Sequence, residues 1–174
     1  LRSTNWPARM QRLGQGALSS LVPAESELWL DGGHNPSAGR ALAQAFSELN
    51  ERHSRPLVLI WGMLNTKDVG SFIGCYGGIA NRVITITIPD EENAVPADAL
   101  AHAARSHGLV AETAPNLESA LRQASSTVPA PTSASNDARR SSARNAVHAA
   151  EAESSPDPRS AANSRSGVRR MLFW

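Results

Sequence analysis

Two short polar clusters carry residue types that can bind a nucleotide or an acidic substrate. The first, residues 31–36 (DGGHNP), holds a carboxylate, two glycines and a histidine before a predicted helix start. Asp31 can accept hydrogen bonds from sugar hydroxyls, and His34 lies at a helix N-terminus, where anions are favoured. The glycines let the backbone turn sharply and approach a ligand closely. An alternative of equal weight is that Asp31 and Asn35 only satisfy backbone donors of the turn and the helix cap.

The second cluster, residues 62–68 (GMLNTKD), contains Lys67, the only lysine of a chain with sixteen arginines. Its ammonium group can meet a phosphate or a carboxylate. Taken alone, Lys67 is better interpreted as a solvated residue at the start of a helix. Evidence for a metal site is weaker. His102 and His107 are five residues apart rather than the four that place two metal ligands on one helix face. No GxxxxGK[ST] phosphate-binding loop occurs.

The elements that must position these clusters alternate between strand and helix. Apolar and β-branched runs predict strands at 28–30, 57–62, 83–88 and 109–114, and helical spacing predicts helices at 36–49, 69–80, 96–107 and 117–124. This order predicts an α/β fold, a mostly parallel sheet with helices on both faces, and places both clusters at the carboxyl ends of strands. A strand is expected after Ala124, and none is recognised. We therefore predict that the last strand is missing.

Composition divides the chain into a predicted domain, residues 1–126, and a predicted disordered tail, residues 127–174. The tail is rich in Ala, Ser, Arg and Pro, and between 127 and 167 its only large apolar residues are Val128 and Val147. Such a segment buries too little surface to offset its chain entropy. The net charge of +1 argues against a dedicated nucleic-acid binder, and no apolar run is long enough to span a membrane. The chain begins with Leu1 rather than Met, which suggests a fragment.

Three motifs carry a family resemblance: residues 6–11 (WPARMQ), 30–36 (LDGGHNP) and 62–68 (GMLNTKD). Their order and spacing make residues 1–126 similar to the C-terminal domain of folylpolyglutamate synthases, which are often also dihydrofolate synthases and belong to the Mur ligase superfamily. The usual family pattern has WPGR where this chain has Ala8, and DGAHNP where it has Gly33. The resemblance implies a Rossmann-like sheet of the Mur ligase C-terminal type.

The resemblance implies a cytoplasmic, monomeric, ATP-dependent ligase. In that family a dihydropteroate or folate carboxylate takes the γ-phosphoryl group of ATP, and L-glutamate attacks the acyl phosphate. The resemblance implies that Arg9 reaches the ATP phosphates, that Asp31 binds the ribose and that His34 lies near the reacting groups. Lys67, in the third motif, is a further candidate for nucleotide binding. The P-loop, the Mg²⁺ ligands and most of the folate site are expected in an N-terminal domain, so the fragment alone is predicted to be inactive.

Two further hypotheses concern the tail and the site. A frameshift near residue 126 of a GC-rich gene would explain both the tail composition and a missing strand. Asp31→Ala is expected to raise the ATP KM with little change in melting temperature, because Asn35 and Pro36 cap the helix independently. Two other functions stay open: a non-catalytic α/β nucleotide-binding or interaction module, and a nucleic-acid binder that uses the arginine-rich tail.

Overall fold

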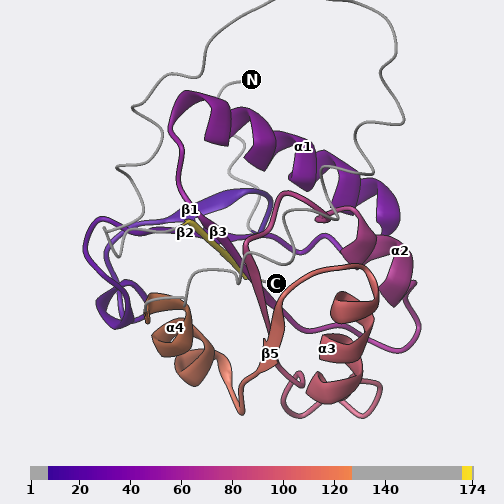
Figure 1. The fold of residues 1–174 in the computed structure, drawn as a ribbon. Coiled ribbons are helices and arrows are strands. Elements are labelled where there is room, and N and C mark those ends of the chain that lie inside the picture. Colours follow the sequence, from indigo (N-terminus) through magenta and orange to yellow (C-terminus); the bar gives the residue numbers. More distant parts are fainter. Residues whose placement is uncertain (1–7, 127–169, 174) are drawn as a thin grey trace, which may run out of the picture. The chain divides into compact units, whose positions relative to one another are not determined.

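The computed structural model describes residues 8–126 and 170–173, which form one six-stranded sheet of order β1-β2-β6-β3-β4-β5 (Figure 1). The edge strand β1 is antiparallel to β2, and all other neighbours are parallel. The predicted mostly parallel α/β sheet is therefore confirmed. The strands are β1 (Gln11–Leu13), β2 (Glu27–Leu30), β3 (Leu57–Trp61), β4 (Arg82–Thr85), β5 (Ala111–Thr113) and β6 (Arg170–Phe173).

Helices cover both faces of the sheet. The helices are α1 (Pro36–Arg52), α2 (Val69–Gly74), α3 (Ala97–Ser106) and α4 (Leu117–Ser125), with a short 3-10 helix η1 (Ser19–Leu21). Apolar residues of α1, α2 and α3 share one core cluster, and those of α4 belong to a second cluster. Strand β3 is buried throughout because Leu59 and Trp61 face the first cluster while Val58 and Ile60 face the second.

Helix starts follow the predicted capping chemistry. The Asn35 side chain accepts a hydrogen bond from the backbone N–H of Ala38 at 2.9 Å, with Pro36 at the first helical position. Asn116 caps α4 in the same way through the N–H of Ser119 at 2.8 Å. Both predicted N-caps are confirmed.

Several elements are shorter than predicted, among them the strand expected at 109–114, which is reduced to Ala111–Thr113, and strand β1 is among those not predicted. The helix expected at 69–80 ends at Gly74, because glycines follow and Gly78 adopts a left-handed φ of 77°. The strand expected at 83–88 ends at Thr85, although the N–H of Ile86 still donates to the carbonyl of Trp61 at 2.9 Å. Strand β1 has only three residues, too few for an alternation pattern to be recognised.

The prediction that the last strand is missing is wrong. Strand β6, close to the end of the chain, lies between β2 and β3 and is parallel to both. Arg170 is paired in register with Glu27 on one side and Leu57 on the other. This finding removes the structural premise of the frameshift hypothesis. The remainder of the predicted tail, residues 127–169 and 174, lies outside the described residues.

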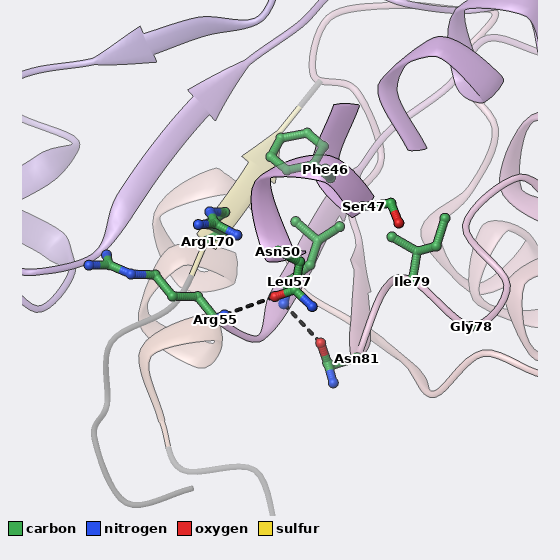
Figure 2. Close-up of a pocket in the computed structure, with 9 residues that line it drawn as sticks. All are labelled: Phe46, Ser47, Asn50, Arg55, Leu57, Gly78, Ile79, Asn81 and Arg170. Carbon is green, nitrogen blue, oxygen red and sulfur yellow. Dashed lines mark hydrogen bonds between the residues drawn. The ribbon is translucent and has the colours of Figure 1, made fainter. Parts of the chain in front are cut away.

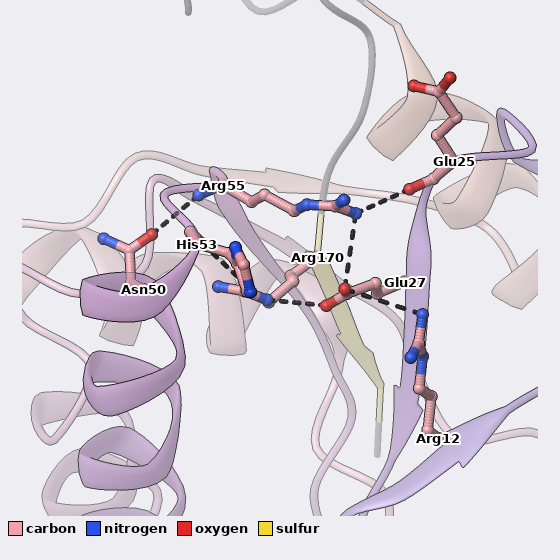
Figure 3. A network of polar contacts seen from close by, with 7 residues as sticks. All are labelled: Arg12, Glu25, Glu27, Asn50, His53, Arg55 and Arg170. Carbon is pink, nitrogen blue, oxygen red and sulfur yellow. Dashed lines mark hydrogen bonds and ion pairs between the residues drawn. The ribbon is translucent and has the colours of Figure 1, made fainter. Parts of the chain in front are cut away.

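Arg170 holds the start of β6 in place (Figure 3). Its side chain is 2% exposed, and its Nε donates to Glu27 Oε2 at 2.8 Å. Its Nη2 donates to the carbonyl of His53 at 2.9 Å, and its backbone N–H donates to the carbonyl of Pro56 at 2.9 Å. One residue therefore joins β2, the end of α1 and the loop before β3.

Glu27 is surrounded by arginines. Its Oε1 lies 3.5 Å from Arg55 Nη1 and 3.7 Å from Arg12 Nη2. Burial acts to raise the pKa of Glu27, but the hydrogen bond and charge of Arg170, followed by the charges of Arg55 and Arg12, outweigh burial and hold this pKa below its ordinary value. The carboxylate thus stays ionised opposite a buried guanidinium.

Glu27→Gln is expected to lower the free energy of unfolding at pH 7 by about 2 kcal/mol, because Gln keeps an acceptor but removes the charge that balances Arg170. The folded pKa of Glu27 lies below its ordinary value of 4.5, so the stabilisation is complete above that pH and is lost as the pH falls through the folded pKa. Urea unfolding at several pH values measures this difference.

Glu118→Gln is the matched control, since its pair with Arg122 is 62% exposed on both sides and contributes little. A Glu27→Gln variant as stable as this control at pH 7 would contradict a stabilising role for the buried pair.

Candidate functional site

Both polar clusters lie at the carboxyl edge of the sheet. Residues 31–36 follow β2 and residues 62–68 follow β3, and these strands are parallel members of one sheet. Strand β6 lies between them, so the two clusters are separated by one strand rather than adjacent. This arrangement agrees with the predicted placement, because ligands bind beyond the carboxyl ends of such strands.

Asp31 is the most constrained side chain of the first cluster. It is 4% exposed, its Oδ1 accepts from the N–H of Gly33 at 2.7 Å, and its Oδ2 accepts from the N–H of Met10 at 2.6 Å. The N–H of Gly32 also donates to the carbonyl of Ala8 at 2.8 Å. Asp31 therefore connects the turn at residues 8–10 to the turn after β2 by hydrogen bonds; residues 8–10 are called the tied turn below. The structure supports the turn-stabilising alternative for Asp31, although each carboxylate oxygen retains capacity for a second bond.

Arg9 lies inside this tied turn. Its neighbours Ala8 and Met10 make the two contacts to the 31–33 turn, and the Arg9 side chain is exposed. The structure thus brings the backbone of Arg9 to the predicted ribose-binding turn. Sequence reasoning missed the role of Met10, since a backbone donor has no residue-type signal.

The two departures from the usual family motifs have a structural basis. Ala8 has φ 55°, in the left-handed region that glycine adopts more easily, and glycine is the usual residue at this position in the resembled pattern. A Cβ added to Gly33 would lie 2.8 Å from Asp31 Oδ1 and 2.9 Å from the Cβ of Ala38. In this chain the backbone at 31–38 is therefore packed too closely for the usual alanine.

His34 is half-buried beside the same turn. Its Nδ1 lies 3.0 Å from the carbonyl oxygen of Gly32. A carbonyl only accepts, so Nδ1 donates in this contact, and in the neutral form of the ring Nε2 is then the acceptor. The ring is therefore oriented by the turn that Asp31 stabilises.

Tyr76 adds a buried hydroxyl near Asp31. Burial raises the pKa of Tyr76 above its ordinary value, and the negative charge of Asp31 raises it further. The Tyr76 hydroxyl has no hydrogen-bond partner within the part of the chain that the structure describes. The hydroxyl therefore stays protonated and is a hydrogen-bond donor near Asp31.

The second cluster is anchored to a neighbouring loop. The N–H of Asn65 donates to the carbonyl of Asn93 at 2.8 Å, and the N–H of Val95 donates to the carbonyl of Met63 at 2.8 Å. Lys67 is half-buried and forms no ion pair with any described residue. Its placement on this fixed loop keeps it a candidate ligand for an anion.

Asp68 has a clear structural role. It is the N-cap of α2 and accepts from the N–H of Ser71 at 3.0 Å. Hydrogen bonds from Ser71 lower the pKa of Asp68 below its ordinary value. The capping function could have been predicted from an Asp directly before a helix start.

A cavity of about 90 Å³ lies at the opposite, amino edge of the sheet (Figure 2). Its lining includes Phe46, Asn50, Leu57, Asn81 and Arg170. Its volume is that of about three water molecules, too small for a nucleotide. Among residues 8–126 and 170–173 no cluster of His, Cys, Asp and Glu could hold a metal ion. No helix in the same ranges is long and apolar enough to cross a bilayer.

The glutamate ligase domain of the Mur ligases matches residues 9–134, which is more than half of the chain. The chain belongs to this Mur ligase domain family. A folylpolyglutamate synthase of Lacticaseibacillus casei is 28% identical over 102 residues, covering 55% of this chain and 23% of the relative. A probable bifunctional folylpolyglutamate synthase/dihydropteroate synthase of Haloferax volcanii is 32% identical over 83 residues, covering 48% of this chain and 8% of the relative. This Mur ligase domain therefore spans less than a quarter of either relative.

Solved structures share the fold of this Mur ligase domain. A Mycobacterium tuberculosis folylpolyglutamate synthase complexed with ADP and AMPPCP has a TM-score of 0.56 and 20% identity, covering 97% of this chain and 29% of that one. A bifunctional folylpolyglutamate synthase/dihydrofolate synthase with Mn, AMPPNP and L-glutamate bound has a TM-score of 0.57 and 23% identity. The match covers 71% of this chain and 26% of that one. The predicted resemblance and fold type are confirmed.

Gly33→Ala is expected to lower the free energy of unfolding by about 1–3 kcal/mol, because its Cβ must push against Asp31 and Ala38. Thermal unfolding measures the loss. Gly32→Ala is the matched control: its Cβ would meet the Ala8 carbonyl oxygen at 3.6 Å, an ordinary contact. Equal stabilities of the two variants would show that the turn can relax around an alanine at position 33.

Proposed function

We propose that this domain supplies one side of the active site of an ATP-dependent ligase that joins L-glutamate to dihydropteroate or a folate. The observation that carries this proposal is the tied turn at the carboxyl edge of the sheet. Asp31 holds residues 8–10 beside residues 31–33, so the backbone of Arg9 lies next to the turn that precedes and orients His34. Relatives of the same family are folylpolyglutamate synthases, and solved relatives carry adenine nucleotides and, in one case, L-glutamate.

In the proposed reaction, a substrate carboxylate oxygen attacks the γ-phosphorus of ATP, and ADP leaves. The amine of L-glutamate then attacks the acyl carbon, phosphate leaves and an amide forms. Phosphate is a far better leaving group than a carboxylate oxygen, so the remaining task is positioning and neutralisation of charge. When Mg²⁺ is bound, it neutralises the charge of the phosphates. We assign the residues that hold it to another domain of the parent enzyme.

The residues of this chain have separate proposed roles. The exposed Arg9 guanidinium reaches the ATP phosphates from a turn whose backbone is fixed. Asp31 accepts a ribose hydroxyl with the lone pairs left over from its two backbone bonds, and Lys67 approaches the nucleotide from the second cluster. His34, with Nε2 as an acceptor, is proposed to lie near the reacting groups and is the candidate catalytic residue. A monomeric, cytoplasmic parent enzyme remains a prediction.

The test separates binding from turnover in the full chain. AMPPNP added to isotope-labelled protein is expected to shift the amide signals of residues 8–10 and 31–35, while those of α4 stay unchanged. Glutamate-dependent ATP hydrolysis with tetrahydrofolate or dihydropteroate is expected to be absent, because no P-loop occurs in the sequence.

Shifts confined to other regions would overturn the nucleotide-site proposal. Turnover by the chain alone would show that it holds a complete active site. Binding without turnover, even when a P-loop domain from a relative is added, would favour a non-catalytic nucleotide-binding module.

Asp31→Ala is expected to affect both stability and nucleotide binding, in contrast to the expectation from sequence. Two charge-assisted hydrogen bonds to backbone donors are lost, which lowers the free energy of unfolding by about 3 kcal/mol and the melting temperature by roughly 10 °C. Below that temperature, the AMPPNP shifts of residues 8–10 are expected to disappear, since their turn loses its anchor.

Asn116→Ala, which removes the cap of α4 and costs about 1 kcal/mol, is the control for a general loss of stability. If Asp31→Ala destabilises the fold but binds AMPPNP as tightly as the control variant, Asp31 is a structural residue only.

A further inference from the structure

The small cavity at the amino edge of the sheet is lined by several hydrogen-bond donors (Figure 2). It has a volume of about 90 Å³ and lies between the second half of α1, the start of β3 and the residues before β4. The residues proposed to bind the nucleotide lie at the carboxyl edge of the same sheet, so the proposed function makes no use of this cavity.

Two asparagines of the cavity lining are oriented by the backbone. The N–H of Arg55 donates to Asn50 Oδ1 at 2.9 Å, and the N–H of Leu57 donates to Asn81 Oδ1 at 2.9 Å (Figure 2). A backbone N–H only donates, so in each case the atom that faces it is the amide oxygen. The NH2 group of each side chain is therefore left for another partner, and neither group donates to a described residue.

Arg170 adds a buried positive charge to the lining. Its side chain is 2% exposed, and its Nε and Nη2 donate to Glu27 and to the carbonyl of His53. Its Nη1 has no acceptor among the described residues. A guanidinium carries five N–H donors in one plane, in a geometry that matches a carboxylate. The cavity thus combines donors from one charged group and two amides.

The charge beside the cavity is positive. Arg12, Arg55 and Arg170 surround the single carboxylate of Glu27, so three positive charges meet one negative charge and two remain uncompensated (Figure 3). Water screens the charge of Arg12, which is 62% exposed, but not that of the buried Arg170. The carbonyl end of α1 would repel an anion, and Arg170 offsets that effect through its bond to the carbonyl of His53. The local charge therefore favours an anion.

The rest of the lining limits the size and chemistry of that anion. Phe46, Leu57 and Ile79 supply apolar surface. A volume of about three water molecules holds a carboxylate with one or two carbon atoms and excludes an aromatic acid. A tetrahedral, strongly hydrated phosphate needs donors on every side, which apolar walls do not provide. A carboxylate, polar at one end and apolar at the other, fits this lining better.

We propose that this cavity is a binding site for a short carboxylate, such as formate or acetate. The carboxylate oxygens accept hydrogen bonds from Arg170 and from the NH2 groups of Asn50 and Asn81, and the carbon end lies against the apolar walls. A ligand of about four non-hydrogen atoms makes few contacts, so a dissociation constant on the order of 1 mM is expected. Because Arg170 begins β6, the bound carboxylate favours the state in which β6 is paired between β2 and β3.

The test is an NMR titration of the isotope-labelled full chain, in which acetate replaces chloride at constant ionic strength. We expect saturable shifts of the side-chain NH2 signals of Asn50 and Asn81 and of the guanidinium signals of Arg170. The NH2 signal of Asn116, which caps α4, is expected to stay unchanged. Absent shifts, or shifts that grow linearly with acetate, overturn the proposal. Equal saturable shifts with benzoate, which is too large for the cavity, place the binding on the outer surface and overturn it as well.

Asn81→Asp removes the NH2 donor while keeping an acceptor for the N–H of Leu57. The new carboxylate lies where the ligand would bind and is itself attracted by Arg170. We expect acetate binding at least tenfold weaker than in the wild type, with no loss of melting temperature. Asn116→Asp is the matched control, since it keeps the cap to the N–H of Ser119, and its acetate affinity is expected to equal that of the wild type.

A second variant covers the case in which Asn81→Asp does not fold. Asn50→Asp keeps the acceptor for the N–H of Arg55 and places the same charge on the other side of the cavity lining, on α1. The same tenfold loss of acetate affinity is expected. Wild-type acetate affinity in either aspartate variant of the cavity overturns the proposal.

Discussion

The hydrogen-bonded ion pair between Arg170 and Glu27 joins residues 143 positions apart, and the rest of the sheet depends on it. Without β6, strands β2 and β3 would have no hydrogen-bonded connection, because they are not neighbours. Those two strands carry the two polar clusters of the candidate site. The separation of the clusters is therefore set by a strand from the end of the chain, although the pair itself lies at the opposite edge of the sheet.

Much of the sheet could be predicted from sequence because its signals are local. The continuous apolar run of β3 and the caps at Asn35 and Asn116 each depend on neighbouring residues only. Strand β6 could not be predicted in the same way. Four residues after a long Ala-, Ser- and Arg-rich segment carry little pattern of their own, and the partner that identifies Arg170 lies on β2. The burial of an arginine is decided by a distant carboxylate, which no local pattern contains.

The residues of the candidate site are named by sequence reasoning, and their division of roles is not. The sequence places Asp31 at the end of a strand, and it leaves open whether the carboxylate binds a ligand or the backbone. The structure shows the backbone contacts to Met10 and Gly33 directly. A carboxylate can stabilise a turn and contact a ribose through the same two oxygens, because each oxygen can accept a second hydrogen bond. The two roles therefore cannot be separated by residue type, and a change at Asp31 is expected to disturb both the turn and the proposed ribose contact.

Backbone strain around Arg9 connects these features. Ala8 and Met10 have φ values of 55° and 43°, in the left-handed region that costs a non-glycine residue about 1–2 kcal/mol. The Asp31 carboxylate and the Gly32 N–H bond this turn from the other side and offset that cost. Strain of this kind persists only where surrounding contacts over-determine it, and it concentrates at sites where a side chain must be held ready. The one exposed side chain between the two strained residues is Arg9. The contacts that hold this strained turn thus fix the backbone of the arginine proposed to meet the phosphates, so that backbone ordering adds little to the cost of binding a nucleotide.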